Sequence, residues 1–304
     1  MEEDDNNSIY ELSSFGWEIA ILQIKLQIYF QSLNVVQVNG KYDFCTERAV
    51  KEVQQKIGRE ETGKVDWFTN EALTKGLNIR IEDQNINDIE LVIQSNKRNC
   101  WAASIAMMTK SDETTIYNKA PRHLLHKEPT MQGDLTESEE DIKNGREIGK
   151  AIAETYRLVY YEPQPWSVYG ILELIKNGPV LNLNAKAGAN LRHAMVIVGA
   201  VSANYRDLWT YLYVYDPWLE DANHKKWVPY TNWFNAANAD FKIFSREPNF
   251  DYQANAGRRP TQKNEKAVKT TLQGDDVSPV TPYVKPTPDN QKQQQKEWWH
   301  IFDN

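Results

Sequence analysis

The chain of 304 residues lacks several features that define large classes of protein. It has only two cysteines, Cys45 and Cys100, so a framework of several disulfides is excluded. No run of residues approaches the roughly 18 apolar residues that span a bilayer, and we therefore expect no membrane span. The net charge is −7 and the basic residues form no stripe, which argues against nucleic acid as a partner.

Signals for export, phosphate binding and metal binding are also missing. Residues 1–7 are acidic where an export signal is basic, and they hold no apolar segment, so we expect no cleavable signal. No glycine-rich loop that would cradle a phosphate is present. His123 and His126 lie one helical turn apart, but no cysteine or clear set of carboxylates completes a metal site beside them. We expect neither a metal ion nor a cofactor.

One of the two cysteines occupies a position that suits chemistry. Cys100 separates a polar, basic segment (residues 94–99) from an apolar run with helical character. The first N–H groups of a helix have no intrahelical partner and the helix dipole is positive there, so a thiolate is stabilised at this place, more so beside Lys97 and Arg98. We interpret Cys100 as a candidate nucleophile and Cys45 as a structural residue.

Residues 15–78 have the pattern of a small three-helix domain. Helices are predicted over residues 17–32, from Thr46 as N-cap, and over residues 69–75, with glycine-containing turns between them. This segment resembles the peptidoglycan-binding domain of bacterial wall hydrolases in a set of spaced features: Leu26-Gln27, Val38-Asn39-Gly40, Ala49-Val50, Val53-Gln54-Gln55, Gly63-Lys64-Val65-Asp66 and Ala72-Leu73. The resemblance implies peptidoglycan as a ligand; a helical bundle without affinity for the wall is the alternative.

Residues 88–250 show a second pattern, in which helices precede strands. A connector over residues 78–92 ends in an extended run at 89–93, and the helix of Cys100 follows it. Further helices are predicted over residues 147–156 and from Ser167 to the stop at Gly178-Pro179. Strands are predicted over residues 157–161, 180–185, 194–201 and 209–215, and the continuous apolar run of the third of these is typical of a central strand.

The end of the chain changes in composition. Aromatic residues at 227–234 are predicted to close the second domain as core and lid. Residues 251–304 are rich in proline and glutamine and are predicted to form a flexible linker. The linker ends in an aromatic segment with Trp298 and Trp299, which we expect to dock on this chain or on another one.

A histidine and an aspartate flank the hairpin that the last two predicted strands would form. If the hairpin turns near Asn204-Tyr205, residue i pairs with 409 − i, and His193 lies directly opposite Asp216. His193 could then take the proton of Cys100 while Asp216 orients the imidazole. Gln94 lies six residues before Cys100, and its amide could donate to the oxyanion that forms when the thiolate attacks a carbonyl.

Residues 90–245 resemble papain-like cysteine peptidases, in the bacterial branch related to effector proteases and to bacteriocin-leader peptidases. The matching features are Gln94, Cys100-Trp101-Ala102-Ala103-Ser104, Gly178-Pro179-Val180, His193-Ala194 and Asp216-Pro217-Trp218. The resemblance implies Cys100 as nucleophile, His193 as base, Asp216 as orienting group and Gln94 in the oxyanion hole. It also implies an α+β fold of two lobes, in which the helix of the cysteine faces a β-sheet lobe across a cleft. Plant papains carry asparagine where this chain has Asp216.

The predicted function is a cysteine hydrolase of peptide or amide bonds, carried to the cell wall by its N-terminal domain. Its substrate would be the peptide stem of peptidoglycan or its cross-link. Without an export signal, an antibacterial effector delivered by a contact-dependent secretion machinery fits the sequence, with action at the wall or in the periplasm of a target cell. In that case we expect a cognate immunity protein that plugs the cleft.

The sequence leaves three alternatives open. The first is a papain-like protease toxin that cleaves proteins. The second is acyl transfer to an amine, because cysteine, histidine and aspartate in this chain order also serve transglutaminases. The third is a wall-binding adaptor with an inert catalytic fold, for which residues 1–80 alone would pellet with peptidoglycan.

Overall fold

The computed structural model describes residues 9–75, 77, 80–86, 88–125, 135, 147–186, 192–218, 223–234 and 242–247, and only the backbone of residues 184–186 and 192. All of these lie in one compact unit, Met1–Arg258. The predicted linker and aromatic segment at residues 251–304 lie outside the described residues.

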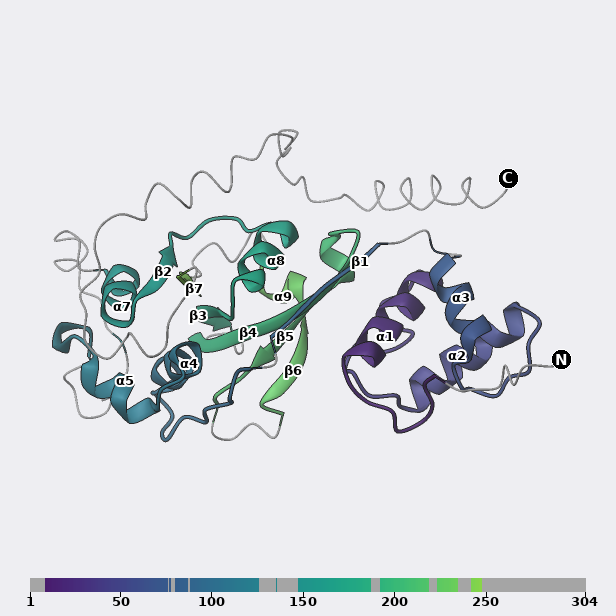
Figure 1. The fold of residues 1–304 in the computed structure, drawn as a ribbon, viewed down its shortest axis with the longest axis horizontal. Helices are drawn as coiled ribbons and strands as arrows, with labels where there is room; N and C mark the ends of the chain where they lie inside the picture. The colour runs from purple at the N-terminus through teal and green to yellow at the C-terminus, as the bar shows by residue number, and fades with distance from the viewer. Residues whose placement is uncertain are drawn as a thin grey trace. The chain divides into compact units, whose positions relative to one another are not determined.

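The N-terminal part of the chain folds into three helices, as predicted (Figure 1): α1 (Trp17–Tyr29), α2 (Phe44–Lys56) and α3 (Trp67–Lys75). They share a small apolar core of buried residues: Ile19, Leu22, Leu26, Val36, Tyr42, Ala49, Val50, Val53, Val65 and Leu73. The prediction of Thr46 as N-cap of α2 is wrong. Asp43 caps this helix, and its carboxylate accepts hydrogen bonds from both the backbone N–H and the hydroxyl of Thr46.

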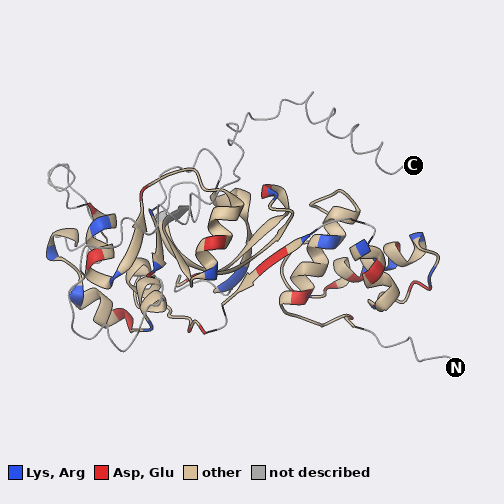
Figure 2. Ribbon diagram, turned by 45° about the horizontal axis from the view of Figure 1, so that its top comes forward, with Lys and Arg blue, Asp and Glu red and all other residues tan. Residues whose placement is uncertain are grey.

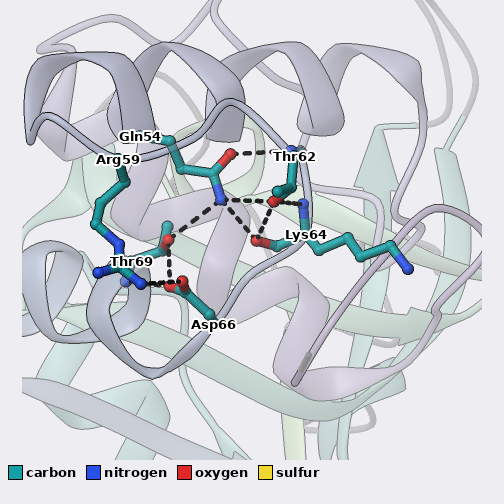
Figure 3. A network of polar contacts seen from close by, with 7 residues as sticks. Gln54, Arg59, Thr62, Lys64, Asp66 and Thr69 are labelled. Atoms are coloured by element: carbon teal, nitrogen blue, oxygen red, sulfur yellow. Dashed lines mark hydrogen bonds and ion pairs between the residues drawn. The ribbon is translucent and has the colours of Figure 1, made fainter. Parts of the chain in front are cut away.

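A polar motif occurs twice in these helices, each time around a buried glutamine. Gln54 donates to Thr62 Oγ1, to the Lys64 carbonyl and to Thr69 Oγ1, and accepts from the Gly63 N–H (Figure 3). Gln23 makes the equivalent bonds to the turn at residues 39–46. The two turns read Asn39-Gly-Lys-Tyr-Asp-Phe-Cys-Thr46 and Thr62-Gly-Lys-Val-Asp-Trp-Phe-Thr69, and both glycines have φ near +70°. The repeat shows why these positions are polar although they are buried.

The rest of the unit is built on a sheet, in which the described residues form seven strands. Six of these strands follow the order β2-β7-β3-β4-β5-β6, and the seventh, β1, pairs with β4 outside this order. All the pairs are antiparallel. The strands are β1 (Ile81–Asn85), β2 (Leu158–Tyr161), β3 (Val180–Lys186), β4 (Arg192–Ala203), β5 (Thr210–Tyr215), β6 (Lys225–Pro229) and β7 (Lys242–Arg246). The strands predicted near residues 157, 180, 194 and 209 are therefore confirmed.

The central strand β4 separates two apolar cores. Its alternating side chains send Ala194, Val196 and Val198 to one face and Met195 and Ile197 to the other. The first face is covered by α4 (Cys100–Thr109), α5 (Glu113–Lys119) and α7 (Ile148–Tyr156), and the second by α8 (Val168–Lys176) and α9 (Tyr230–Trp233) (Figure 1). Because both faces are covered, β4 is apolar from Ala194 to Val201, as the sequence indicated. Ser167 caps α8, and α9 lies in the predicted aromatic segment.

The segment between the helical domain and α4 differs from the prediction. The extended run lies at β1, earlier than the predicted residues 89–93. β1 pairs with residues 199–203 of β4, beyond the part of β4 that pairs with β3, so it extends the sheet along the same side. The sheet therefore includes residues that precede the predicted domain start at residue 88. The backbone hydrogen bonds between β1 and β4 explain why the polar sequence of β1 forms a strand.

The helical domain contacts the sheet through α1. Ala20 and Ile24 of α1 pack with Val201 and Ala203 of β4, and Tyr211 Oη of β5 donates to Gln27 Oε1 at 3.0 Å. The ring of Trp17 lies so close to Gly199 that a Cβ atom there would stand 2.6 Å from it. That Cβ atom would also stand 2.7 Å from the Gln84 carbonyl oxygen, so a side chain at Gly199 would displace both the Trp17 ring and the backbone of β1.

Charged side chains of both signs are interspersed over the described elements (Figure 2). Within the described ranges, no helix has the length and apolar character needed to cross a membrane. Some of these charges form partly exposed ion pairs between residues close in sequence, such as Lys51 with Glu47 and Lys150 with Glu147. We attribute little stability to them, because exposed pairs contribute at most about 1 kcal/mol each.

Candidate active site

Cys100 is the first residue of α4, as predicted. The eight residues that follow it, from Trp101 to Met108, are all buried against the sheet. This packing fixes α4, and with it the position of the sulfur at the tip of the helix. Cys100 itself is partly exposed, so a substrate can reach it. Cys45, the other free thiol, lies near the start of α2 and is exposed.

The structure brings His193 and Asp216 together. His193 Nε2 lies 2.6 Å from Asp216 Oδ1 in a buried hydrogen bond, and both residues are 4% exposed. The imidazole also hydrogen-bonds to the side chain of Cys100. Because Nε2 faces Asp216, Nδ1 is the ring nitrogen left for the sulfur. The three side chains thus form a chain of hydrogen bonds from the sulfur through the imidazole to the carboxylate.

The predicted register of the hairpin is wrong, although the contact that it predicted is present. The chain turns at Asn204 and Tyr205, but a 3-10 helix, η3 (Asp207–Trp209), lengthens the connection. Val196 consequently pairs with Tyr215, and a bulge follows between residues 197 and 199. His193 therefore meets Asp216 diagonally, within the reach of side chains two residues out of register on one face of a sheet.

The ionisation of this pair follows from burial and from its partners. Burial alone lowers the pKa of His193, but the hydrogen bonds to Asp216 and to Cys100 outweigh it and raise that pKa to about 9. Burial alone raises the pKa of Asp216, but the hydrogen bond and the charge of His193, with a hydrogen bond from Lys226, hold it well below its usual range. At neutral pH the site therefore contains an imidazolium and a carboxylate.

A prediction for the pH dependence follows. We expect kcat/KM to fall as the pH rises through about 9, because His193 then loses the proton that the leaving amine needs. The pKa of His193 is higher in the folded protein than its ordinary value of 6.5, so its contribution to stability is complete below pH 6.5 and is lost as the pH rises through about 9. Steady-state rates and urea unfolding between pH 6 and 10 test this, and His193→Gln should remove this part of the pH dependence of stability. An alkaline limb of the rate profile below pH 7 would contradict the prediction.

Gln94 is completely buried beside the segment that follows Asp216. Its backbone N–H donates to the Pro217 carbonyl at 2.9 Å, which ties the segment before α4 to the residue that follows Asp216. Its side-chain Nε2 donates to the Asn96 carbonyl at 2.6 Å, and Oε1 is buried with no hydrogen-bond partner among the described residues. The bond to Asn96 uses one of the two hydrogens on Nε2. The other could donate to an oxyanion, and this role of Gln94 stays a prediction.

Glu113, on α5, is a residue of the site that the sequence analysis missed. Its carboxylate accepts from the N–H and the hydroxyl of Ser95, both at 2.7 Å, and from Asn99 Nδ2 at 2.6 Å. Ser95 follows Gln94 and Asn99 precedes Cys100, so one carboxylate holds both ends of the loop that leads to the nucleophile. No short-range sequence signal marks this role, because an acidic residue in the first turn of a helix is common and is usually exposed to solvent.

Lys226, on β6, is a second missed residue. Its ammonium lies 2.7 Å from Asp216 Oδ2, the oxygen that His193 does not use. The indole of Trp218, two residues after the aspartate, packs edge-on against the His193 ring with 5.6 Å between centroids. Among the described residues, no group of three or more histidine, cysteine or acidic side chains could hold a metal ion, and His126 lies outside those residues.

Two family models match the chain. Residues 82–239, just over half of the chain, match the family model described as papain-like cysteine protease AvrRpt2. Residues 16–73 match the model of a peptidoglycan binding domain. No curated protein matches the chain.

Among solved structures, the chain is similar to a C39-like peptidase from Bacillus anthracis. The two are 16% identical over 55% of this chain and 98% of the other, with a TM-score of 0.38. By the match over residues 82–239, the chain belongs to the family of the papain-like cysteine protease AvrRpt2, and it is a cysteine peptidase with a peptidoglycan-binding domain at its N-terminal side.

Proposed function

We propose that this peptidase cleaves peptide or amide bonds in the peptide part of peptidoglycan, with Cys100 as nucleophile, His193 as proton carrier, Asp216 as orienting group and Gln94 as oxyanion donor. The observation that carries the assignment of the residues is the hydrogen-bonded chain from Cys100 through His193 to Asp216. The observation that carries the substrate class is the peptidoglycan-binding match over residues 16–73, on the same compact unit as the sheet.

The reaction uses these side chains in two stages. The thiolate of Cys100 attacks the carbonyl carbon and the oxygen becomes an oxyanion, which the amide of Gln94 stabilises by hydrogen bonding. The imidazolium of His193 gives its proton to the leaving amine, so the C–N bond breaks and a thioester remains. His193, now neutral, takes a proton from water, and the resulting hydroxide equivalent attacks the thioester and releases the acid and the thiolate.

Digestion of purified sacculi tests the substrate class. We expect wild-type protein to release peptide fragments whose masses show hydrolysis within the stem or the cross-link, while Cys100→Ala releases none. If an amine replaced water as the acceptor, the products would carry that amine in the same mass spectra. Identical products from both proteins would exclude a role for Cys100 in the cleavage.

A protein substrate is the second candidate, favoured by the match to a family of proteases. It predicts intact sacculi together with new cleavage sites in a proteome-wide screen, again only with Cys100 present. The same two digestions therefore separate the two substrate classes. Cleavage of sacculi without cleavage of folded proteins supports the peptidoglycan assignment.

The role of the protein as an antibacterial effector is a separate proposal. It is supported by the combination of a cysteine peptidase with a wall-binding domain, because such a combination would damage the wall of a neighbouring cell. It requires an immunity protein and a secretion machinery in the producing cell. Viability of bacteria that express the protein in the periplasm, with Cys100→Ala as the inactive control, tests the toxicity that this role requires.

A further inference from the structure

We propose that Lys226 is a positioning residue of the active site, and that its ammonium is the reason why an aspartate rather than an asparagine stands at residue 216. The inference rests on the proposed roles of Cys100, His193 and Asp216. It concerns the choice of acid or amide at this one position, which the resemblance to papain leaves unexplained.

The two oxygens of Asp216 face three donors. Oδ1 accepts from His193 Nε2 at 2.6 Å and from the Trp218 N–H at 3.0 Å, and Oδ2 accepts from Lys226 Nζ at 2.7 Å. The carboxylate is buried, and the Lys226 side chain is 34% exposed. A position surrounded by donors on both sides needs two acceptor oxygens, and among neutral and anionic side chains of this size only a carboxylate has them.

The fold places Lys226 there through the ladder between β5 and β6. Lys226 pairs with Val214, and Lys225 pairs with Tyr215. Beyond the end of β5, the Asp216 N–H donates to the His224 carbonyl at 2.7 Å, so the backbone of Asp216 is held in place next to β6. Successive side chains of a strand point to opposite faces, and Lys225 accordingly lies over the ring of Tyr215 instead, with Nζ 4.7 Å from its centroid.

An amide at residue 216 cannot satisfy this arrangement. If its oxygen stays with His193 and Trp218, its NH₂ group faces the ammonium of Lys226, so that one donor points at another. If the amide turns over, its NH₂ group faces His193 Nε2, and the imidazolium loses its acceptor. Each orientation places two donors face to face at the buried end of this side chain, which is unfavourable. Without the ammonium, the first orientation no longer places two donors face to face.

The ammonium also acts on the imidazole through the shared carboxylate. The titratable groups that face this carboxylate and the imidazole, among the described residues, are Cys100 from α4, His193 from β4 and Lys226 from β6, with His224 on the Asp216 carbonyl. The positive charge of Lys226 offsets part of the negative charge of Asp216, the hydrogen-bond partner of His193. Its removal should therefore strengthen the hold of Asp216 on the imidazolium and move the loss of the His193 proton to higher pH.

The test is a double-mutant cycle in the full chain with Asp216→Asn, Lys226→Met and both together. The first readout is the rate at which iodoacetamide alkylates Cys100 between pH 5 and 10, followed by peptide-resolved mass spectrometry so that Cys45 is counted separately. This rate depends on the imidazolium that stabilises the thiolate, and it needs no substrate. The second readout is kcat and KM on purified muropeptides.

We expect Asp216→Asn to lower the alkylation rate at pH 6 and kcat by about 100-fold, and the double variant to recover at least about tenfold of each loss. Lys226→Met alone should move the alkaline limb of the kcat/KM profile up by about half a pH unit or more. Lys226→Arg should behave as wild type, because it keeps the charge. Lys225→Met is the matched control, since it removes the same charge one residue away and should change neither readout.

The inference is overturned if the double variant is as slow as Asp216→Asn in the alkylation assay, or if Lys225→Met shifts the profile as much as Lys226→Met. Thermal unfolding of each variant identifies any that fail to fold, and Lys226→Gln, which offers an acceptor oxygen to the amide, then replaces Lys226→Met. Coupling in alkylation without cleavage of any muropeptide would support the role of Lys226 and reject the proposed substrate.

Discussion

Cys100→Ala is expected to lower kcat/KM for cleavage of muropeptides by at least about 10⁴-fold. The sulfur forms the covalent intermediate, and removal of a nucleophile that acts as a unit with a histidine costs up to about 10⁶-fold in other hydrolases. What remains comes from binding and from the oxyanion hole alone. Product release measured by chromatography and mass over several hours covers this range of rates.

The matched control for this variant is Cys45→Ala. It removes the other thiol of the chain, which is exposed on α2 and far in sequence from His193. We expect Cys45→Ala to keep wild-type kcat/KM and to lose only the slow, unassisted alkylation of an exposed thiol. A Cys100→Ala protein that keeps more than about a hundredth of the wild-type rate would disprove the nucleophilic role.

Glu113→Ala is expected to lower both the stability of the protein and its rate of catalysis. The carboxylate holds three donors from Ser95 and Asn99, and it is almost completely buried. Its loss leaves these donors without their acceptor, and we expect the free energy of unfolding to fall by about 3 kcal/mol or more. The loop that contains Gln94 and leads to Cys100 then loses its support, so we expect kcat to fall by about 10- to 100-fold with little change in KM.

Asp112→Ala separates the loop contacts from the stability of α5. Asp112 caps the same helix, and its carboxylate accepts from the N–H and the hydroxyl of Thr115 within α5 itself. Its loss should cost about 1 kcal/mol of stability and leave kcat unchanged. Urea unfolding and steady-state kinetics on both variants test this. If Asp112→Ala and Glu113→Ala reduce kcat equally, Glu113 has no specific effect on the loop.

Local sequence patterns were sufficient for most of the elements and for Cys100. The apolar run after Cys100 could bury its surface only as a covered helix, and the run around Met195 only as a covered central strand. Ser167 and Gly178 marked both ends of α8, because capping and termination depend on a few neighbouring residues. The glycine-containing turns between the first three helices were predicted as well, whereas the glutamine around which each of them closes was not.

Features that depend on long-range pairing were predicted less well. β1 has a polar sequence, and only its pairing with residues 199–203 of β4 makes it a strand. The N-cap of α2 is Asp43, because the neighbouring turn around Gln23 uses the hydroxyl of Thr46. The hairpin register was wrong because η3 occupies residues that a tight turn would omit.

The sequence by itself determined the order of the chemistry-bearing residues and the two domains, because a helix start, an apolar strand and a glycine turn are local properties. Only the tertiary structure decided which side chains complete the site. Glu113 and Lys226 reach it from α5 and β6, elements whose sequences look like ordinary solvated segments. Their roles depend on the register of β5 with β6 and on the packing of α5 beside α4, and such non-local contacts leave no signature in a single sequence.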